Sequence, residues 1–194
     1  MTKRLEDMTL EELWELFPIV LTEHNESWKQ WAFDEIACLK TILGQVKASY
    51  HHIGSTAVNN IMSKPIIDII IEIEDITTFA TIKTILTHAG YICMSESESR
   101  LSLNKGYTPD GYAERVFHIH VRQTNDTDEI YFRDYLNSHS DVAKDYELLK
   151  LSLCTKYKHN RDGYTQAKTS FVNRYTELAK HLTAKTEPNP EQIK

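Results

Sequence analysis

The sequence predicts an α+β fold: a mixed β-sheet with flanking helices and a helical C-terminal half. The first observation is a strand signal over 66–73, where six of the eight residues are isoleucine. Such a near-continuous apolar strand is typical of a sheet that is covered on both faces. The second observation is the order of the periodic segments, in which helices and strands are mixed up to about residue 122 and only helical segments follow.

Composition indicates one globular domain. The chain has 194 residues, of which 41% are hydrophobic and 26% are charged, and this length is enough for a sizeable core. We expect a single domain over 1–182, with the sheet core at about 19–122 and the helical part at about 128–182. The segment 183–194 is polar and carries two prolines, so we expect a disordered tail there.

Charge and cysteine content narrow the function classes. The net charge of −6 argues against a nucleic-acid partner but leaves room for a local basic pocket that binds a phosphate-bearing small molecule. The three cysteines, Cys38, Cys93 and Cys154, are far apart in the sequence, which is typical of a reduced cytoplasmic protein. The N-terminus lacks the apolar run of a signal peptide, and we expect no membrane span.

Helices are predicted where apolar residues recur at three- and four-residue spacing. Thr9 and Glu12 form a capping box that opens the first helix, and Ser140 and Asp162 are expected to cap two later ones. The predicted helices span 10–17, 26–43, 78–88, 129–137, 140–157 and 162–182. The predicted strands span 19–21, 46–53, 66–73, 91–94, 101–105 and 116–121, with a turn at 108–111.

The chemistry is expected at a turn and at the strand that follows it. The segment 51–58 (His-His-Ile-Gly-Ser-Thr-Ala-Val) leaves an apolar strand through Gly54 and Ser55, and the N–H groups of such a turn suit a phosphate. Asp68 interrupts the isoleucine strand, where an ionised carboxylate is costly unless cations or hydrogen-bond donors meet it. A metal-bound phosphate would explain both features. The alternative is an ordinary turn and an Asp68 that pairs with Lys64 or caps a turn.

The run His-Ile-Gly-Ser-Thr-Ala-Val, followed by Lys-Pro-Ile-Ile-Asp-Ile, closely resembles the GrpB-like family, which is similar to the nucleotidyltransferase superfamily that includes DNA polymerase beta. The resemblance extends over about residues 18–180. It implies a nucleotidyltransferase-like sheet in which Gly54 and Ser55 hold phosphates and Asp68 holds a metal ion.

The sequence departs from the family pattern at two places. The superfamily has a second acid two residues after the first, and Ile70 stands there instead, a departure that concerns catalysis rather than the fold. Asn59 and Asn60 stand where GrpB-like sequences usually have proline and glycine. Asparagine tolerates unusual turn conformations, so we expect the turn to be kept.

Two histidines are candidates to complete a metal site. His118 and His120 share one face of the strand predicted at 116–121, because side chains alternate along a strand. If that strand lies beside the Asp68 strand, one imidazole stands where the superfamily has its third carboxylate. Such a set would suit Mn²⁺, Fe²⁺ or Zn²⁺ better than Mg²⁺, and either histidine could instead serve as a general base. The alternative is a polar sheet face.

Neighbouring polar residues are expected to have lesser roles. Glu72 is about 13 Å from Asp68 at about 3.3 Å per residue, too far to share a metal ion, and is expected to be a solvated acid at the strand end. Of His51 and His52, one faces the cleft by alternation, and the sequence leaves open which.

Four cations could neutralise phosphates: Lys64, Arg133, Lys150 and Lys168. From the sequence alone, Arg133 would pair with Asp134, and Lys150 and Lys168 would lie on solvated helix faces. The family resemblance favours Arg133 and Lys168 as contacts for the anionic substrate.

These features predict a metal-dependent nucleotidyltransferase that uses Mg²⁺ or Mn²⁺ and acts on a small-molecule acceptor, with Asp68 and His120 as catalytic residues. The alternative is a catalytically degenerate module that binds a nucleotide or a coenzyme-A-like ligand without turnover. Its basis is the missing second acid at Ile70, since the remaining groups neutralise the charge of a catalytic metal ion incompletely. The sequence has no Gly-x-Ser-x-Gly, Walker A or Gly-x-Gly-x-x-Gly motif, which argues against the enzyme classes that those motifs mark.

Overall fold

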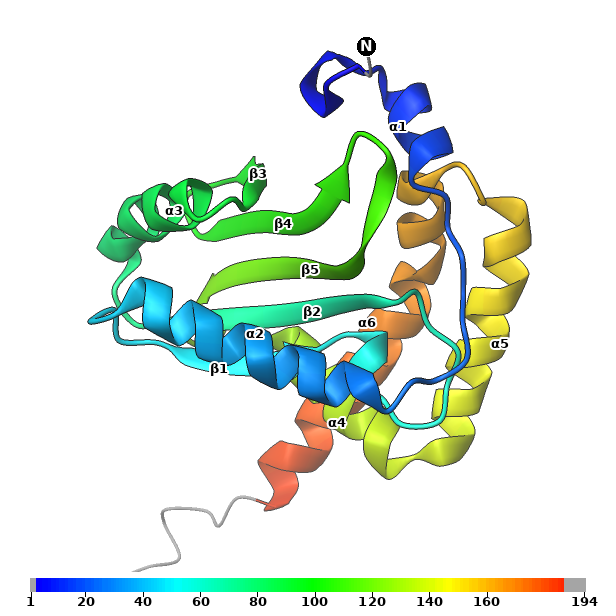
Figure 1. Cartoon of the computed structure of the whole chain (residues 1–194). Helices are drawn as coiled ribbons and strands as arrows, with labels where there is room; N and C mark the ends of the chain where they lie inside the picture. Colours follow the sequence, from blue (N-terminus) through cyan, green and yellow to red (C-terminus); the bar gives the residue numbers. More distant parts are fainter. Residues whose placement is uncertain (1–2, 187–194) are drawn as a thin grey trace, which may run out of the picture.

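The computed structural model describes residues 3–186, and at its centre is a five-stranded sheet in the order β1-β2-β5-β4-β3 (Figure 1). β2 pairs antiparallel with β1 and parallel with β5, whereas β4 pairs antiparallel with both β5 and β3. The sheet is therefore mixed, as predicted. Its strands are β1 (Ser49–Ile53), β2 (Ile66–Ile73), β3 (Ile92–Glu96), β4 (Arg100–Thr108) and β5 (Gly111–Gln123).

Helices surround the sheet, and the part of the described chain that follows β5 is helical (Figure 1). The helices are α1 (Leu10–Leu16), α2 (Ser27–Leu43), α3 (Phe79–His88), α4 (Asp128–Ser138), α5 (Ser140–Lys156) and α6 (Arg161–Thr186). Short 3-10 turns are formed by Leu5–Asp7, Ser55–Ala57 and Ile76–Thr78. Within residues 3–186, none of these helices has the length and the apolar character needed to cross a membrane.

Helices α2 and α3 cover one face of the sheet. Alternate residues of β2, Ile67, Ile69 and Ile71, are fully buried there against Trp28 of α2 and Ile82 of α3. Burying one isoleucine side chain contributes about 1.5–3 kcal/mol, so this face supplies much of the stability of the fold. The other residues of β2, including Asp68, point to the opposite face.

Helices α4, α5 and α6 form a second cluster around residues such as Leu136, Tyr146 and Ala179. Val58 and Ile61, from the loop between β1 and β2, are buried in the same cluster. The loop that follows Gly54 is therefore fixed to the helical half. Asn60 in this loop has a φ of 58°, a left-handed conformation that asparagine tolerates. This agrees with the expectation that the turn is kept with asparagine in place of glycine.

The predicted helix starts are confirmed at one place and wrong at two. Thr9 caps α1 with a full capping box, in which the Glu12 N–H donates to Thr9 Oγ1 (3.2 Å) and the Thr9 N–H donates to Glu12 Oε2 (2.7 Å). Ser140 and Asp162 are not caps, because α5 already includes Ser140 and α6 begins at Arg161.

The strand bounds also differ in places. The strand predicted at 19–21 is wrong: the described chain there makes only an isolated bridge between Thr22 and Ser63. β1 begins at Ser49 instead of Val46. β4 and β5 are longer than predicted because they continue as one hairpin up to the turn at 108–111. Helix α6 runs to Thr186, so the first four residues of the predicted tail are helical, and 187–194 lie outside the described residues.

Candidate functional site

A cavity of about 790 Å³ lies between the Asp68 face of the sheet and helices α4, α5 and α6. This volume is within the usual range for a small-molecule site. Its lining combines apolar side chains with many charged ones. The polar lining residues on the strand side and along the helices include Ser55, Lys64, Asp68, His118, His120, Arg133, Lys150, Arg161 and Lys168.

The turn after β1 brings the backbone against Asp68. Gly54 has φ 72° and ψ −172°, a combination that is essentially restricted to glycine. A Cβ atom at this position would overlap the Asp68 carboxylate. The 3-10 turn Ser55–Ala57 follows at once, and Ser55 lines the cavity. The sequence needs glycine at position 54 because the turn approaches the acid so closely.

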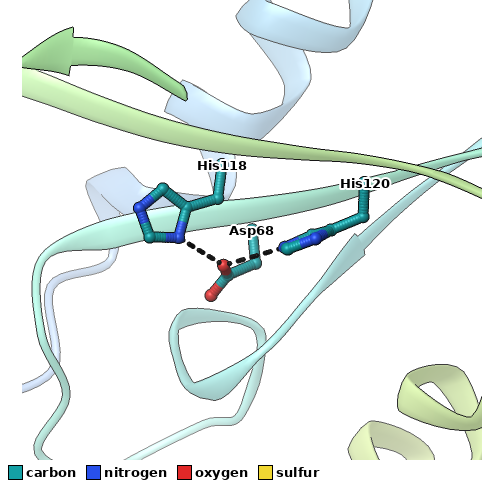
Figure 2. Close-up of side chains that lie close together, drawn as sticks. All are labelled: Asp68, His118 and His120. Carbon is teal, nitrogen blue, oxygen red and sulfur yellow. Dashed lines mark hydrogen bonds and ion pairs between the residues drawn. The ribbon is translucent and has the colours of Figure 1, made fainter. Parts of the chain in front are cut away.

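Asp68, His118 and His120 lie together because β2 and β5 are parallel neighbours in register (Figure 2). Asp68 lies across from His118, and Ile70 lies across from His120. His118 Nδ1 is 3.2 Å from Asp68 Oδ1, and His120 Nε2 is 3.4 Å from the same oxygen. One oxygen or nitrogen atom from each of the three side chains lies within 4.8 Å of the others.

Three further residues support this cluster, and the sequence analysis did not single them out. The Tyr107 hydroxyl is 2.8 Å from His118 Nε2, and Arg161 Nη2 donates to that hydroxyl (2.9 Å). Arg122 Nη2 lies 3.4 Å from His120 Nδ1. Of these three residues, only Arg122 could have been predicted from the sequence, because it follows His118 and His120 at every second position of β5.

The electrostatics of the cluster favour an ionised Asp68. Burial raises the pKa of its carboxyl group, but the hydrogen bonds and charges of His118 and His120 outweigh burial and lower it. Burial also lowers the pKa of His118, against the opposing effect of Asp68. Metal binding requires an ionised carboxylate, and this environment favours one at Asp68.

This donor set fits a divalent metal ion. Two imidazole nitrogens and one carboxylate oxygen suit Mn²⁺, Fe²⁺ or Zn²⁺ better than Mg²⁺, which prefers oxygen ligands. The hydrogen-bond partners of Asp68 are the two histidines. The alternative prediction, an ion pair between Asp68 and Lys64, is therefore wrong.

Lysines form one wall of the cavity. Burial, together with the charges of Lys168 and Arg161, lowers the pKa of Lys64 to about 7. Burial and Lys168 likewise lower the pKa of Lys150 to about 7, and burial lowers that of Lys168 to about 8. These cations crowd one another in a partly desolvated space, and a polyanion would relieve their repulsion.

The prediction of solvated helix faces is wrong for Lys150. Its side chain is 2% exposed, and its Nζ donates to the Met62 carbonyl and to Ser63 Oγ. Lys168 is half-buried and lies over the ring of Tyr164 at 4.3 Å. Tyr164 lines the same wall, and its hydroxyl is buried away from solvent without a hydrogen-bond partner in the described chain.

Arg133 forms the expected ion pair with Asp134. Its Nε donates to Asp134 (2.7 Å), and its Nη1 donates to the His52 carbonyl (2.7 Å), which ties α4 to the end of β1. Arg133 also lines the cavity. Part of its hydrogen-bonding capacity is therefore used in holding the fold.

Glu72, His51 and His52 lie outside the cavity lining. Glu72 is 3.2 Å from His51 Nε2 and one-fifth exposed, so the prediction of a solvated acid is wrong. His51 shares the Asp68 face of the sheet, whereas His52 contacts Thr56 Oγ1 at 3.0 Å. Burial lowers the pKa of His52 to about 4, so it is neutral near neutral pH.

Comparison with known structures relates the fold to known proteins. A crystal structure of GrpB from Enterococcus faecalis superposes with a TM-score of 0.72 at 29% identity, over 82% of this chain and 96% of that one. A crystal structure of the Cid1 poly(U) polymerase with Mg 3'-dATP bound superposes with a TM-score of 0.51 at 11% identity, over 81% of this chain and 51% of that one. The second likeness concerns the fold alone, which is that of the nucleotidyltransferases.

Sequence comparison gives the family. The chain is 33% identical to the glutamate-rich protein GrpB of Alkalihalophilus pseudofirmus, over 80% of this chain and 92% of that protein. It is 32% identical to the UPF0157 protein YqkA of Bacillus subtilis, over 81% of this chain but only 46% of that protein, so it spans about half the length of this relative. The family model described as "GrpB protein" matches residues 18–178. The chain therefore belongs to the GrpB family.

Proposed function

We propose that the protein is a metal-dependent nucleotidyltransferase that transfers a nucleotidyl group to a small-molecule acceptor. The observation that carries the proposal is the position of Asp68, which lies between the Gly54 turn and two histidines at one side of a cavity with a wall of lysines. The same cavity therefore offers a cation site and an anion site.

In this reaction a hydroxyl oxygen of the acceptor forms a bond to the α-phosphorus of a nucleoside triphosphate, the bond to the leaving pyrophosphate breaks, and the hydroxyl proton is released to water. A divalent ion such as Mn²⁺ or Mg²⁺, when bound, would neutralise phosphate charge and activate the attacking oxygen. Asp68 and His118 would hold that ion, and His120 is the second catalytic residue. Backbone N–H groups at Gly54 and Ser55 would hold phosphate oxygens.

The leaving pyrophosphate would lie against Lys64 and Lys168, with Arg161 and Arg133 at the borders of the same wall. Charged hydrogen bonds from these side chains stabilise the negative charge that develops on the leaving group.

A second candidate is a module that binds a nucleotide or a coenzyme-A-like ligand without turnover. Ile70 favours it: this side chain takes the place of the superfamily's second acid and is fully buried beside His120. With one carboxylate, the site neutralises a divalent ion less completely than the usual set of acids does.

Thermal unfolding with a panel of nucleotides and coenzyme A, each with Mn²⁺, Mg²⁺ or chelator, tests the proposal. A ligand at 100 times its dissociation constant should add about 2.7 kcal/mol, or about 5–10 °C in Tm. Asp68→Asn should abolish a metal-dependent effect. Glu72→Gln is the matched control, because Glu72 is an acid on the same strand and face but outside the cavity lining.

The outcomes separate the candidates. Metal-dependent stabilisation that Asp68→Asn alone removes supports the enzyme. Pyrophosphate release with a set of small hydroxyl-bearing acceptors then tests transfer. Stabilisation that ignores metal and survives Asp68→Asn supports the binding module. No response to any nucleotide or to coenzyme A contradicts both.

A further inference from the structure

Two hydrogen-bond chains converge on one oxygen of Asp68. The first runs from Arg161 through the Tyr107 hydroxyl to His118, and from His118 Nδ1 to Asp68 Oδ1. The second runs from Arg122 to His120 Nδ1, and from His120 Nε2 to the same Oδ1. Each chain begins at a guanidinium group, which has N–H donors and no acceptor. This fixes the direction of the first hydrogen bond in each chain.

The second chain fixes the tautomer of His120. Since Arg122 can only donate, His120 Nδ1 must be the acceptor. A neutral imidazole carries one N–H, so this N–H is at Nε2 and points at Asp68. Arg122 has little freedom to move away, because it is 6% exposed and its Nη1 donates to the carbonyl of Val121 (3.0 Å).

In the first chain an N–H of His118 also faces Asp68, but the hydrogen bonds of this chain can reverse their direction. Arg161 donates to the Tyr107 oxygen, so the Tyr107 hydrogen is free to point at His118 Nε2, and the N–H of His118 is then at Nδ1, facing Asp68. Unlike a guanidinium, a hydroxyl both donates and accepts. If its hydrogen turns to the nearby hydroxyl of Tyr112, the Tyr107 oxygen can accept from His118 Nε2–H. His118 then presents a lone pair at Nδ1 with no net gain or loss of a proton.

We infer that the two histidines are not equivalent: His118 joins Asp68 as a ligand of a divalent cation, whereas His120 keeps its Nε2–H and donates a hydrogen bond to a phosphate oxygen of the bound substrate. Metal ligation by His120 would need its N–H at Nδ1, directly against the N–H of Arg122. Tyr107 and Arg122 are positioning residues that set this difference. Only the phosphate partner of His120 rests on the proposed function.

Long-range ¹H–¹⁵N correlation spectra of protein labelled with ¹⁵N-histidine test the assignment directly. His118→Gln and His120→Gln identify the two signals among the nine histidines. We expect an Nδ1–H tautomer at His118 and an Nε2–H tautomer at His120 without metal. Saturation with diamagnetic Zn²⁺ should convert His118 to Nε2–H and leave His120 unchanged. A His120 in the Nδ1–H form, or conversion of both rings, overturns the inference.

Zn²⁺ titration calorimetry gives an independent measure. His118→Gln should weaken Zn²⁺ binding by tenfold or more, and His120→Gln by less than about threefold. Arg122→Gln offers an acceptor to Nδ1–H and should let His120 change tautomer, whereas Arg122→Lys, a donor only, should restore the wild-type spectrum. Equal losses in the two histidine variants contradict the inference. These experiments use no nucleotide, so their failure is distinguishable from failure of the proposed transferase activity.

Discussion

The Cα of Gly54 lies so close to the Asp68 carboxylate that a Cβ atom at position 54 would overlap it. The turn and the acid are 14 positions apart in the chain, yet each limits what the other can be. A phosphate held by the N–H groups of this turn would lie beside the carboxylate that we propose as a cation ligand. This proximity is the geometric basis for treating the two as one site.

Gly54→Ala should therefore affect both stability and binding. The alanine must adopt a conformation that is essentially restricted to glycine and must also displace Asp68, so we expect a loss of about 3 kcal/mol or more in the free energy of unfolding. Zn²⁺ binding, measured by calorimetry, should fall with it. Thermal denaturation gives the stability change.

Gly90→Ala is the matched control for this substitution. Gly90 has a φ of 89°, but no atom lies within 4 Å of a Cβ placed there. We expect a loss of about 1 kcal/mol from backbone strain with unchanged Zn²⁺ affinity. If the two variants lose equal stability and both bind Zn²⁺ normally, the close approach to Asp68 has no functional role.

Local pattern was enough to predict the strand that carries Asp68. Six isoleucines define β2 to the residue, and period-two alternation correctly puts His118 and His120 on one face. These features depend on neighbours in sequence, which propensity and periodicity capture. The family resemblance supplied the expectation that the strands of Asp68 and the histidines belong to one sheet.

The support around the site depends on long-range packing, which local pattern does not contain. Tyr107 reaches His118 only because β4 and β5 form a hairpin with a register shift near Lys105. Arg161 lies 54 residues beyond Tyr107. Lys150 was expected to be solvated because its helix shows ordinary amphipathic spacing, whereas the loop around Met62 covers it in the fold.

The lysine wall predicts proton uptake when a polyphosphate binds. At pH 8, Lys64, with a pKa of about 7, is mostly neutral, and Lys168, with a pKa of about 8, is half-protonated. A bound polyanion raises both values, so up to about 1.4 protons should be taken up per ligand. Titration calorimetry with inorganic tripolyphosphate in buffers of different ionisation enthalpy measures this number.

Lys64→Met and Lys168→Met should each reduce the proton uptake and weaken tripolyphosphate binding by about tenfold. Lys83→Met is the control, since Lys83 is exposed and paired with Glu96 outside the cavity lining. Binding without proton uptake at pH 8 would show that the anion does not contact these lysines.

The same lowered pKa values predict how stability depends on pH. Below about pH 7, Lys150 is charged in both the folded and the unfolded states, and the folded state carries the cost of a buried charge. Between about pH 7 and its ordinary pKa near 10.5, the unfolded state binds a proton that the folded state does not. The free energy of unfolding should therefore rise with pH in this window.

Lys150→Met isolates this contribution. The variant should lose up to about 1.4 kcal/mol per pH unit from the slope between pH 7.5 and 9.5, because one titrating group is removed. Urea denaturation at several pH values gives the slope. Parallel curves for the variant and the wild type would mean that Lys150 titrates normally despite its burial.

Restoring the missing acid tests why the site departs from the superfamily pattern. Ile70 is fully buried and lies across from His120, so Ile70→Asp puts a second carboxylate on the Asp68 face two residues away. Burying it should cost about 3–5 kcal/mol without metal. Mn²⁺ should recover part of that loss, because the added charge gives the cation a further ligand.

Ile70→Asn separates the charge from the lost packing. The asparagine amide has nearly the same shape as the aspartate carboxylate and is also costly to bury. It adds no negative charge, so Mn²⁺ should stabilise the Ile70→Asn variant no more than the wild type. A larger Mn²⁺-dependent rise in Tm for Ile70→Asp than for Ile70→Asn would mean that the pocket keeps the geometry of a two-acid site and lacks only the charge. Equal responses would mean that the neighbourhood of His120 has been rebuilt around an apolar residue, which favours the binding module over the enzyme.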